Sequence, residues 1–171
     1  CCGDPANAPA LLVAEGYATA ASLHEATGRP VAVAFDAGNL AHVARALRKL
    51  HRAALLLICA DDDRETAKRT GHNPGREKAT AAAEAVRGAV VWPDALPDGG
   101  SDFNDMAAHA GQEAVRERVE GAIAEALKAR EAREERKPHA ADATALDRFT
   151  LADSGVWFAE LDADGRPKSP L

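Results

Sequence analysis

Short apolar runs alternate with longer amphipathic segments between residues 10 and 111. Runs at 10–14, 31–35, 55–60 and 89–92 carry little polar character, which is typical of strands buried on both faces of a parallel sheet. Segments at 17–27, 40–50 and 76–87 and a short one ending near 111 have helical character. This alternation predicts an α/β fold with about four mostly parallel strands, flanked by helices and joined by right-handed crossovers.

The remainder of the chain has a different pattern. Residues 112–137 predict one long, heavily charged helix, whose single apolar stripe of Val115, Val119, Ile123 and Leu127 should dock on the domain before the helix continues as a linker. Residues 138–171 read as a linker followed by strands at 149–151 and 155–161, with a turn at 162–165. We expect a first domain at 1–111 with its core at 10–111, and the truncated start of a following domain at the end.

The connection at 64–75 is polar and basic, so we expect a loop that ends in a turn at 72–75. Asn39 is suited to cap the helix that begins at residue 40.

The run at 55–60 ends in three consecutive carboxylates, Asp61, Asp62 and Asp63. Adjacent carboxylates repel one another unless a cation or proton intervenes, and hard divalent cations prefer oxygen ligands. Alternation along an extended segment directs Asp61 and Asp63 to one side and Asp62 to the other. We therefore interpret Asp61 and Asp63 as a metal pair and Asp62 as a spacer.

Composition narrows the possible partners. The formal charge is −6, which argues against a broadly basic nucleic-acid coat, and only 4% of residues are aromatic. Three cysteines without a CxxC pair disfavour a zinc site and fit a reducing compartment such as the cytoplasm. No apolar stretch is long enough to suggest a membrane span, so we expect no membrane partner.

Further acids follow other predicted strands. Glu15 comes directly after the first, and Asp102 and Asp105 lie beyond the fourth. Because open α/β sheets bind ligands at the carboxyl ends of their strands, these acids and the aspartate pair are expected to share one cleft. Such a cluster suits one or two Mg²⁺ (or Mn²⁺) ions and phosphoryl or nucleotidyl transfer, with Glu15 as general acid or base.

The motifs EGYATA, ADDD, NPGREKATAAAEAV and SDFND, in this order, resemble a Toprim domain, in the version found in plasmid- and phage-type DNA primases that are often joined to a helicase. The resemblance implies a Rossmann-like fold and an acid/base glutamate at Glu15. It also implies a Mg²⁺-binding pair at Asp61 and Asp63, and late acidic positions at Asp102 and Asp105. The implied partners are a single-stranded DNA template, NTPs, a primase N-terminal part and a helicase.

A local basic segment follows the acids and is expected to bind nucleotide or DNA phosphates. Its cations are Arg64, Lys68, Arg69, Arg76 and Lys78. Two other functions stay open: a metal-dependent Toprim nuclease, and a non-catalytic module that binds nucleic acid or a replisome partner.

Overall fold

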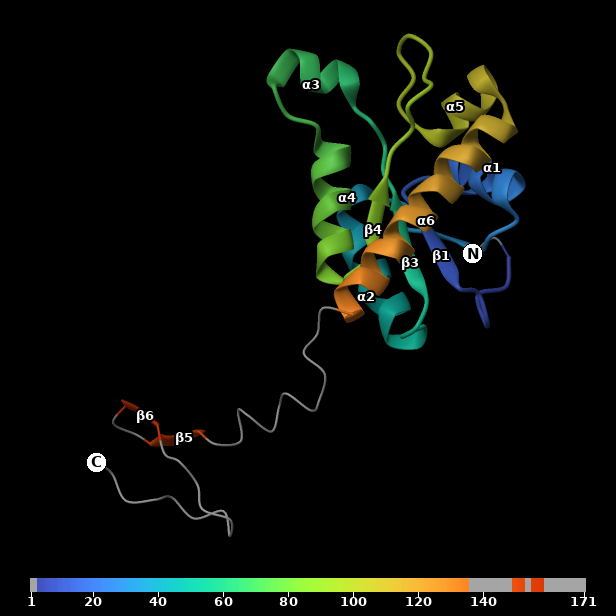
Figure 1. Ribbon diagram of the computed structural model, residues 1–171. Coiled ribbons are helices and arrows are strands. Elements are labelled where there is room, and N and C mark those ends of the chain that lie inside the picture. Colours follow the sequence, from blue (N-terminus) through green and yellow to red (C-terminus); the bar gives the residue numbers. More distant parts are fainter. Residues whose placement is uncertain (1–2, 136–148, 153–154, 159–171) are drawn as a thin grey trace. The chain divides into compact units, whose positions relative to one another are not determined.

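The computed structural model describes residues 3–135, 149–152 and 155–158, and the chain divides into one unit from Cys1 to Ala129 and another from Arg130 to Leu171. The first unit contains one parallel sheet in the order β2-β1-β3-β4 (Figure 1). Its strands are β1 (Ala10–Ala14), β2 (Val31–Val33), β3 (Leu55–Cys59) and β4 (Ala89–Val91). The predicted α/β fold with four parallel strands is confirmed.

The register of the central pair sets the position of the acids. Ala14 of β1 lies opposite Cys59 of β3, so the two strands end at the same level. Because both strands run in the same direction, Glu15 and Asp61 leave the sheet at one edge. The strand order therefore brings the ends of the first and third strands side by side, as expected.

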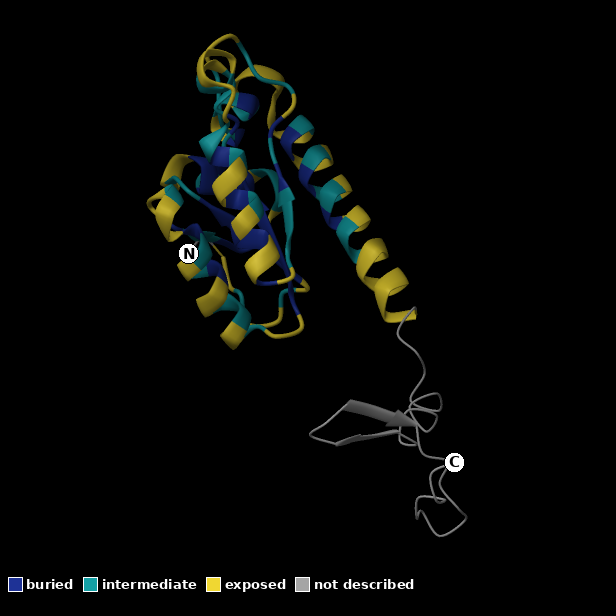
Figure 2. Cartoon of the chain, turned by 90° about the vertical axis from the view of Figure 1, so that its left-hand side faces the viewer, coloured by how far each residue is buried: buried dark blue, intermediate teal, exposed yellow. Residues whose placement is uncertain are grey.

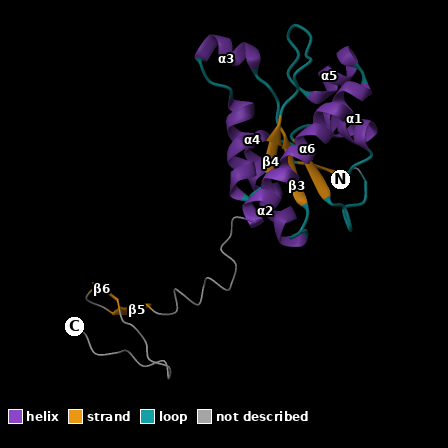
Figure 3. Cartoon of the chain, in the orientation of Figure 1, coloured by secondary structure: helices purple, strands orange, loops and turns teal. Residues whose placement is uncertain are grey.

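Helices cover both faces of the sheet (Figures 1 and 3). One face packs against α2 (Leu40–Leu50) and α4 (Pro74–Ala85), and the other against α1 (Tyr17–Thr27), α5 (Phe103–Ala110) and α6 (Gln112–Glu135). Alternate residues of the fully buried β3 pack on opposite faces of the sheet: Leu57 and Cys59 lie with α1, α5 and α6, whereas Leu56 and Ile58 lie with α2 and α4.

Helix α6 contributes to this core through its apolar stripe. Val115, Val119 and Ile123 are buried, as the dark stripe in Figure 2 shows. Arg29 fixes the same helix from the loop before β2, because its Nε and Nη2 donate to the two carboxylate oxygens of Glu120 at 2.6 and 2.7 Å. A bidentate pair of this kind specifies orientation as well as proximity.

Three local expectations were wrong. The segment after the acids is not a loop, because it forms a further helix, α3 (Arg64–Thr70), which ends at Gly71 in the left-handed conformation. Strand β2 ends at Val33 rather than at residue 35, since Phe35 has a φ of 62° and cannot continue an extended strand. Asn39 does not cap α2 with its side chain, which instead donates to the carbonyl of Ala34.

In the second unit, β5 (Phe149–Ala152) pairs antiparallel with β6 (Gly155–Phe158). The expected turn at 162–165 and most of the expected linker lie outside the described residues. Within the part of the chain that is described, no helix combines the length and apolarity needed to cross a bilayer.

Candidate active site

Asp61 lies at the centre of the acidic edge. Its Oδ1 is buried and has no hydrogen-bond partner in the described structure. Burial raises the pKa of Asp61 to about 7, and the negative charges of Glu15, Asp102, Asp63 and Asp105 contribute in the same direction. The four other predicted acids therefore act electrostatically on this one carboxyl group, with Glu15 having the strongest effect among them.

Two of these acids are held at the beginning of α5. Asp102 caps the helix by accepting the N–H of Asp105 at 2.8 Å, and its second oxygen accepts the hydroxyl of Thr19 in α1 at 2.7 Å. Asp105 accepts the N–H of Ser101 at 2.8 Å. This reciprocal arrangement is close to a capping box, and it fixes both carboxylates beside the sheet edge.

Asp63 is held by the beginning of α4. Its Oδ2 accepts the N–H of Gly75 at 3.0 Å, where the helix dipole favours a negative charge. The approach is so close that a Cβ on Gly75 would lie 2.6 Å from the carbonyl oxygen of Asp61. A residue other than glycine would therefore displace the helix from the two aspartates.

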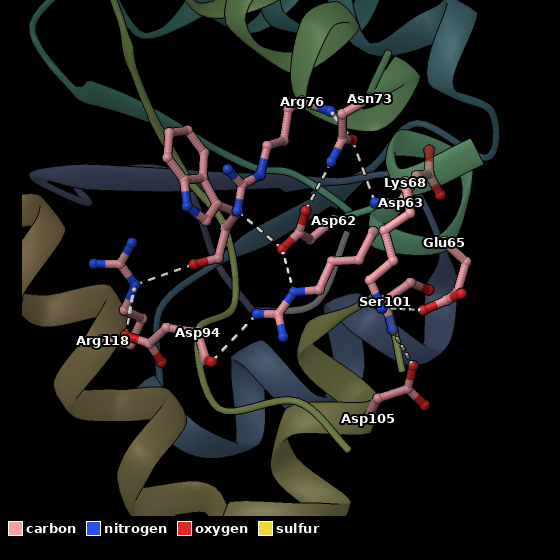
Figure 4. Close-up of polar contacts among 12 residues, drawn as sticks. Asp62, Asp63, Glu65, Lys68, Asn73, Arg76, Asp94, Ser101, Asp105 and Arg118 are labelled. Carbon is pink, nitrogen blue, oxygen red and sulfur yellow. Dashed lines mark hydrogen bonds and ion pairs between the residues drawn. The ribbon is translucent and has the colours of Figure 1, made fainter. Parts of the chain in front are cut away.

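Asp62 is not a spacer, because its side chain is only 1% exposed and forms the centre of a polar network (Figure 4). Its Oδ2 accepts from Arg64 Nε at 2.7 Å and from Arg76 Nη2 at 2.9 Å, and its Oδ1 accepts from Asn73 Nδ2 at 2.8 Å. Burial alone opposes the charged form, but the hydrogen bonds from these three side chains hold the pKa of Asp62 below its usual range.

The Asp62 network joins α4 to the aspartate pair. The side-chain oxygen Oδ1 of Asn73 accepts the N–H of Asp63 at 3.3 Å and caps α4 by accepting the N–H of Arg76 at 3.2 Å. One side chain therefore bonds Asp62 through its nitrogen and the Asp63 backbone through its oxygen. These bonds position the beginning of α4 so that the N–H of Gly75 can donate to the Asp63 carboxylate.

The network continues to the end of β4. The guanidinium of Arg76 lies 4.3 Å from the centre of the Trp92 ring, and Arg64 Nη2 donates to the carbonyl of Asp94 at 3.3 Å. Arg118 of α6 donates to the carbonyl of Trp92 at 3.0 Å and pairs with the Asp94 carboxylate at 3.3 Å (Figure 4). The ends of β3 and β4 are thus tied together beside the acids.

The five predicted phosphate-binding cations fall into two groups. Arg64 and Arg76 are paired with Asp62, and a role toward phosphate stays a prediction for both. Lys68 pairs with Glu65 at 2.8 Å on the surface of α3, while Arg69 on α3 and Lys78 on α4 are exposed.

No set of three or more His, Cys, Asp or Glu side chains forms a ready-made metal cage among the described residues. The donor chemistry nevertheless fits Mg²⁺, which takes one or two protein carboxylates and completes its shell with waters and substrate phosphates. The unpartnered, buried Oδ1 of Asp61 supports this fit because a buried carboxylate oxygen normally has a hydrogen-bond donor or a cation beside it.

Sequence reasoning missed Asp62 and Asn73. Strand alternation already placed Asp62 on the face opposite Asp61, and that face is occupied by α4, whose first residues include Asn73 and Arg76. A buried carboxylate needs such partners, so the position of Asp62 on the covered face of the sheet was the signal in the sequence that pointed to this network.

Comparison with known proteins agrees with the fold. The Toprim domain family matches residues 10–113. Two Escherichia coli proteins named DNA primase TraC are 50% and 48% identical to this chain over 92 residues. Each alignment covers 54% of the chain but only 6% and 9% of the two relatives, so the matched segment spans less than a tenth of either one. The resemblance indicated by the sequence motifs is confirmed.

Proposed function

The chain belongs to the Toprim domain family, and on this premise we propose that it is the Mg²⁺-dependent nucleotidyl-transfer module of a DNA primase. Its relatives by sequence bear the name DNA primase, which supports primase function in general terms. In this role the module contributes to the synthesis of RNA primers on single-stranded DNA from NTPs, in the replication of a plasmid, phage or other mobile element. It would work with a primase N-terminal part and a helicase.

The observation that carries the proposal is the buried, unpartnered Oδ1 of Asp61 at the sheet edge where β1 and β3 end together, with four other acids near enough to raise its pKa. Asp61 and Asp63 would hold Mg²⁺, with Asp102 and Asp105 beside them. When bound, the metal would stabilise charge on the reacting phosphate oxygens. No other arrangement among the described residues combines a buried, unpartnered carboxylate oxygen with so many acids.

The residues of this chain have distinct roles in the proposed reaction. A 3′-hydroxyl oxygen bonds to the α-phosphorus of an NTP, the bond between the α-phosphorus and the bridging oxygen breaks, and pyrophosphate leaves. Glu15 would accept the proton of the attacking hydroxyl as general base. Lys68, Arg69 and Lys78, together with Arg64 and Arg76, would attract the triphosphate or the template backbone.

The test uses the full-length protein that carries this chain, incubated with single-stranded DNA, NTPs and Mg²⁺. We expect new oligonucleotides from the parent and none from Asp61→Asn or Asp63→Asn, whereas Glu125→Gln on the exposed side of α6 behaves as the parent. Shortened DNA would instead show that the protein is a metal-dependent nuclease. Unchanged DNA, together with no Mg²⁺ or Mn²⁺ binding by this chain in calorimetry, would leave a non-catalytic binding module.

A further inference from the structure

Two exposed aromatic side chains flank Glu15. Tyr17 and Phe35 are 67% and 78% exposed, and the third large apolar residue with comparable exposure, Leu50, lies at the end of α2. Tyr17 opens α1 two residues after Glu15, and the N–H of Phe35 donates to the carbonyl of Glu15 at 2.8 Å. In a chain with few aromatic residues, two of them are exposed at the acidic sheet edge, near the candidate catalytic groups.

The backbone at Phe35 is held in a conformation that an aromatic residue rarely adopts. Its φ of 62° lies in the left-handed region, where glycine is strongly favoured over a bulky residue. Hydrogen bonds of the preceding residue hold this turn in place, because the Ala34 N–H donates to the carbonyl of Ala14 and the carbonyl of Ala34 accepts from Asn39 Nδ2. A strained residue that presents its ring to solvent beside an active site calls for an explanation in function.

The charges along this edge are unevenly distributed. The turns that contain Tyr17 and Phe35, residues 15–20 and 34–39, include no Lys, Arg or His. The segment that follows β3 begins with the three aspartates and then carries the five cations named above. Arg64 and Arg76 pair with Asp62 and Lys68 pairs with Glu65, whereas Arg69 and Lys78 are exposed. A nucleotide has the matching polarity, since its base is neutral and aromatic and its phosphates are anionic.

The strand order places the turn at Phe35, after β2, a short distance from the aspartates that follow β3. β2 and β3 both pair with β1, so their ends are separated by two strand spacings, roughly 10 Å. A nucleotide is of comparable length. Its phosphates could lie at the aspartate pair while its base reaches the ring of Phe35.

We propose that Phe35, flanked by Tyr17, is a stacking platform for a nucleobase of the substrate. Aromatic side chains bind bases through their faces with little sequence preference, and one stacked base contributes substantially to affinity. The orientation of the phosphates in this proposal rests on the proposed function, but the stacking contact does not require catalysis.

The test measures binding of fluorescent oligo-dT and, separately, of labelled ATP to this chain, with Mg²⁺ and with EDTA. We expect Phe35→Ala to weaken binding roughly ten-fold and Phe35→Trp to retain it. Leu50→Ala, which removes a comparably exposed apolar side chain from α2, is the matched control and should bind as the parent does. A loss confined to oligo-dT assigns the platform to a template base, and a loss confined to ATP assigns it to the incoming nucleotide. Unchanged affinity for both ligands in Phe35→Ala would overturn the proposal.

Phe35→Gly separates a binding role from a structural one. Glycine relieves the left-handed backbone, so the melting temperature should rise while affinity falls. A lower melting temperature together with unchanged affinity would identify Phe35 as a structural residue and sink the proposal. The two proposals can fail separately. If the parent makes no primers but Phe35→Ala still binds more weakly than the parent, nucleotidyl transfer is rejected and the stacking platform is supported.

Discussion

Arg76 Nη2 lies 2.9 Å from Oδ2 of Asp62, and the guanidinium of the same arginine lies over the ring of Trp92. The contact joins a buried carboxylate at the end of β3 to the first turn of α4 and to the end of β4. Because Asn73 bonds both Asp62 and the backbone of Asp63, the ion pair is part of the support of the proposed metal ligands. Its consequences can be measured separately from catalysis.

Asp62→Asn should destabilise the protein by about 2–4 kcal/mol at neutral pH, because two arginines then face a neutral, partly mismatched partner in a buried position. Urea unfolding followed by circular dichroism measures this difference. The folded pKa of Asp62 is below its ordinary value, so its stabilising effect is present above about pH 4 and is lost as the pH falls through the folded pKa. The gap between parent and variant should therefore shrink in acid, and a gap that stays constant down to pH 2 would contradict the ion-pair explanation.

Asp61→Asn should have the opposite effect in metal-free buffer. The folded pKa of Asp61 is about 7, above its unfolded value, so the parent loses stability as the pH rises from about 4 to about 7. Above pH 7 the variant should be more stable than the parent by roughly 1–3 kcal/mol, because it no longer carries a buried charge among other acids. Adding Mg²⁺ should stabilise the parent and leave the variant unaffected. Equal stability of parent and variant at pH 8 without metal would contradict this account.

Mg²⁺ affinity should increase with pH until Asp61 is ionised. Since metal and proton compete for the same carboxylate, the apparent affinity is expected to rise about ten-fold per pH unit below 7 and to level off above it. Calorimetric titrations in buffers of different ionisation enthalpy count the released proton. A flat profile between pH 5.5 and 8 would show that Asp61 is not a ligand.

Gly75→Ala should impair both folding and metal binding, because the new Cβ would lie 2.6 Å from the Asp61 carbonyl oxygen and 3.2 Å from Asp63 Oδ2. The expected loss of stability is about 1–3 kcal/mol, as for other overpacked sites. Gly121→Ala is the matched control, since nothing lies within 4 Å of its added Cβ and it sits inside α6. That variant should gain roughly 0.5–1 kcal/mol in thermal or urea unfolding. Equal behaviour of the two variants would show that α4 can move away from the aspartates.

The features that the sequence predicted are those with a local pattern. The all-apolar β3 and the helix from Tyr17 to Thr27, which ends at a left-handed Gly28, were found because burial and helix termination have direct signatures in residue type. Helix α3 was missed because its seven residues carry almost no apolar periodicity, and it is defined by backbone bonds and by its end at Gly71.

The candidate site was predictable only in part. Acids at the ends of strands could be assigned to one edge from the alternation of strands and helices. The role of Asp62 was not predictable in the same way, since it depends on Arg76, fourteen residues away, and on the packing of that arginine against Trp92. The left-handed turn at Phe35 likewise has no signal in residue type, because the amino acid there is one that disfavours it.

The fully buried β3 also has a consequence for how the chain tolerates insertions and deletions. Three chemically identical side chains follow its end at Cys59, and only their place along the chain assigns Asp61 to the acidic cleft and Asp62 to the arginines. Gain or loss of a single residue within β3 would shift the three aspartates by one position. Each aspartate would then lie in the environment of its neighbour, although the sequence of the motif would be unchanged.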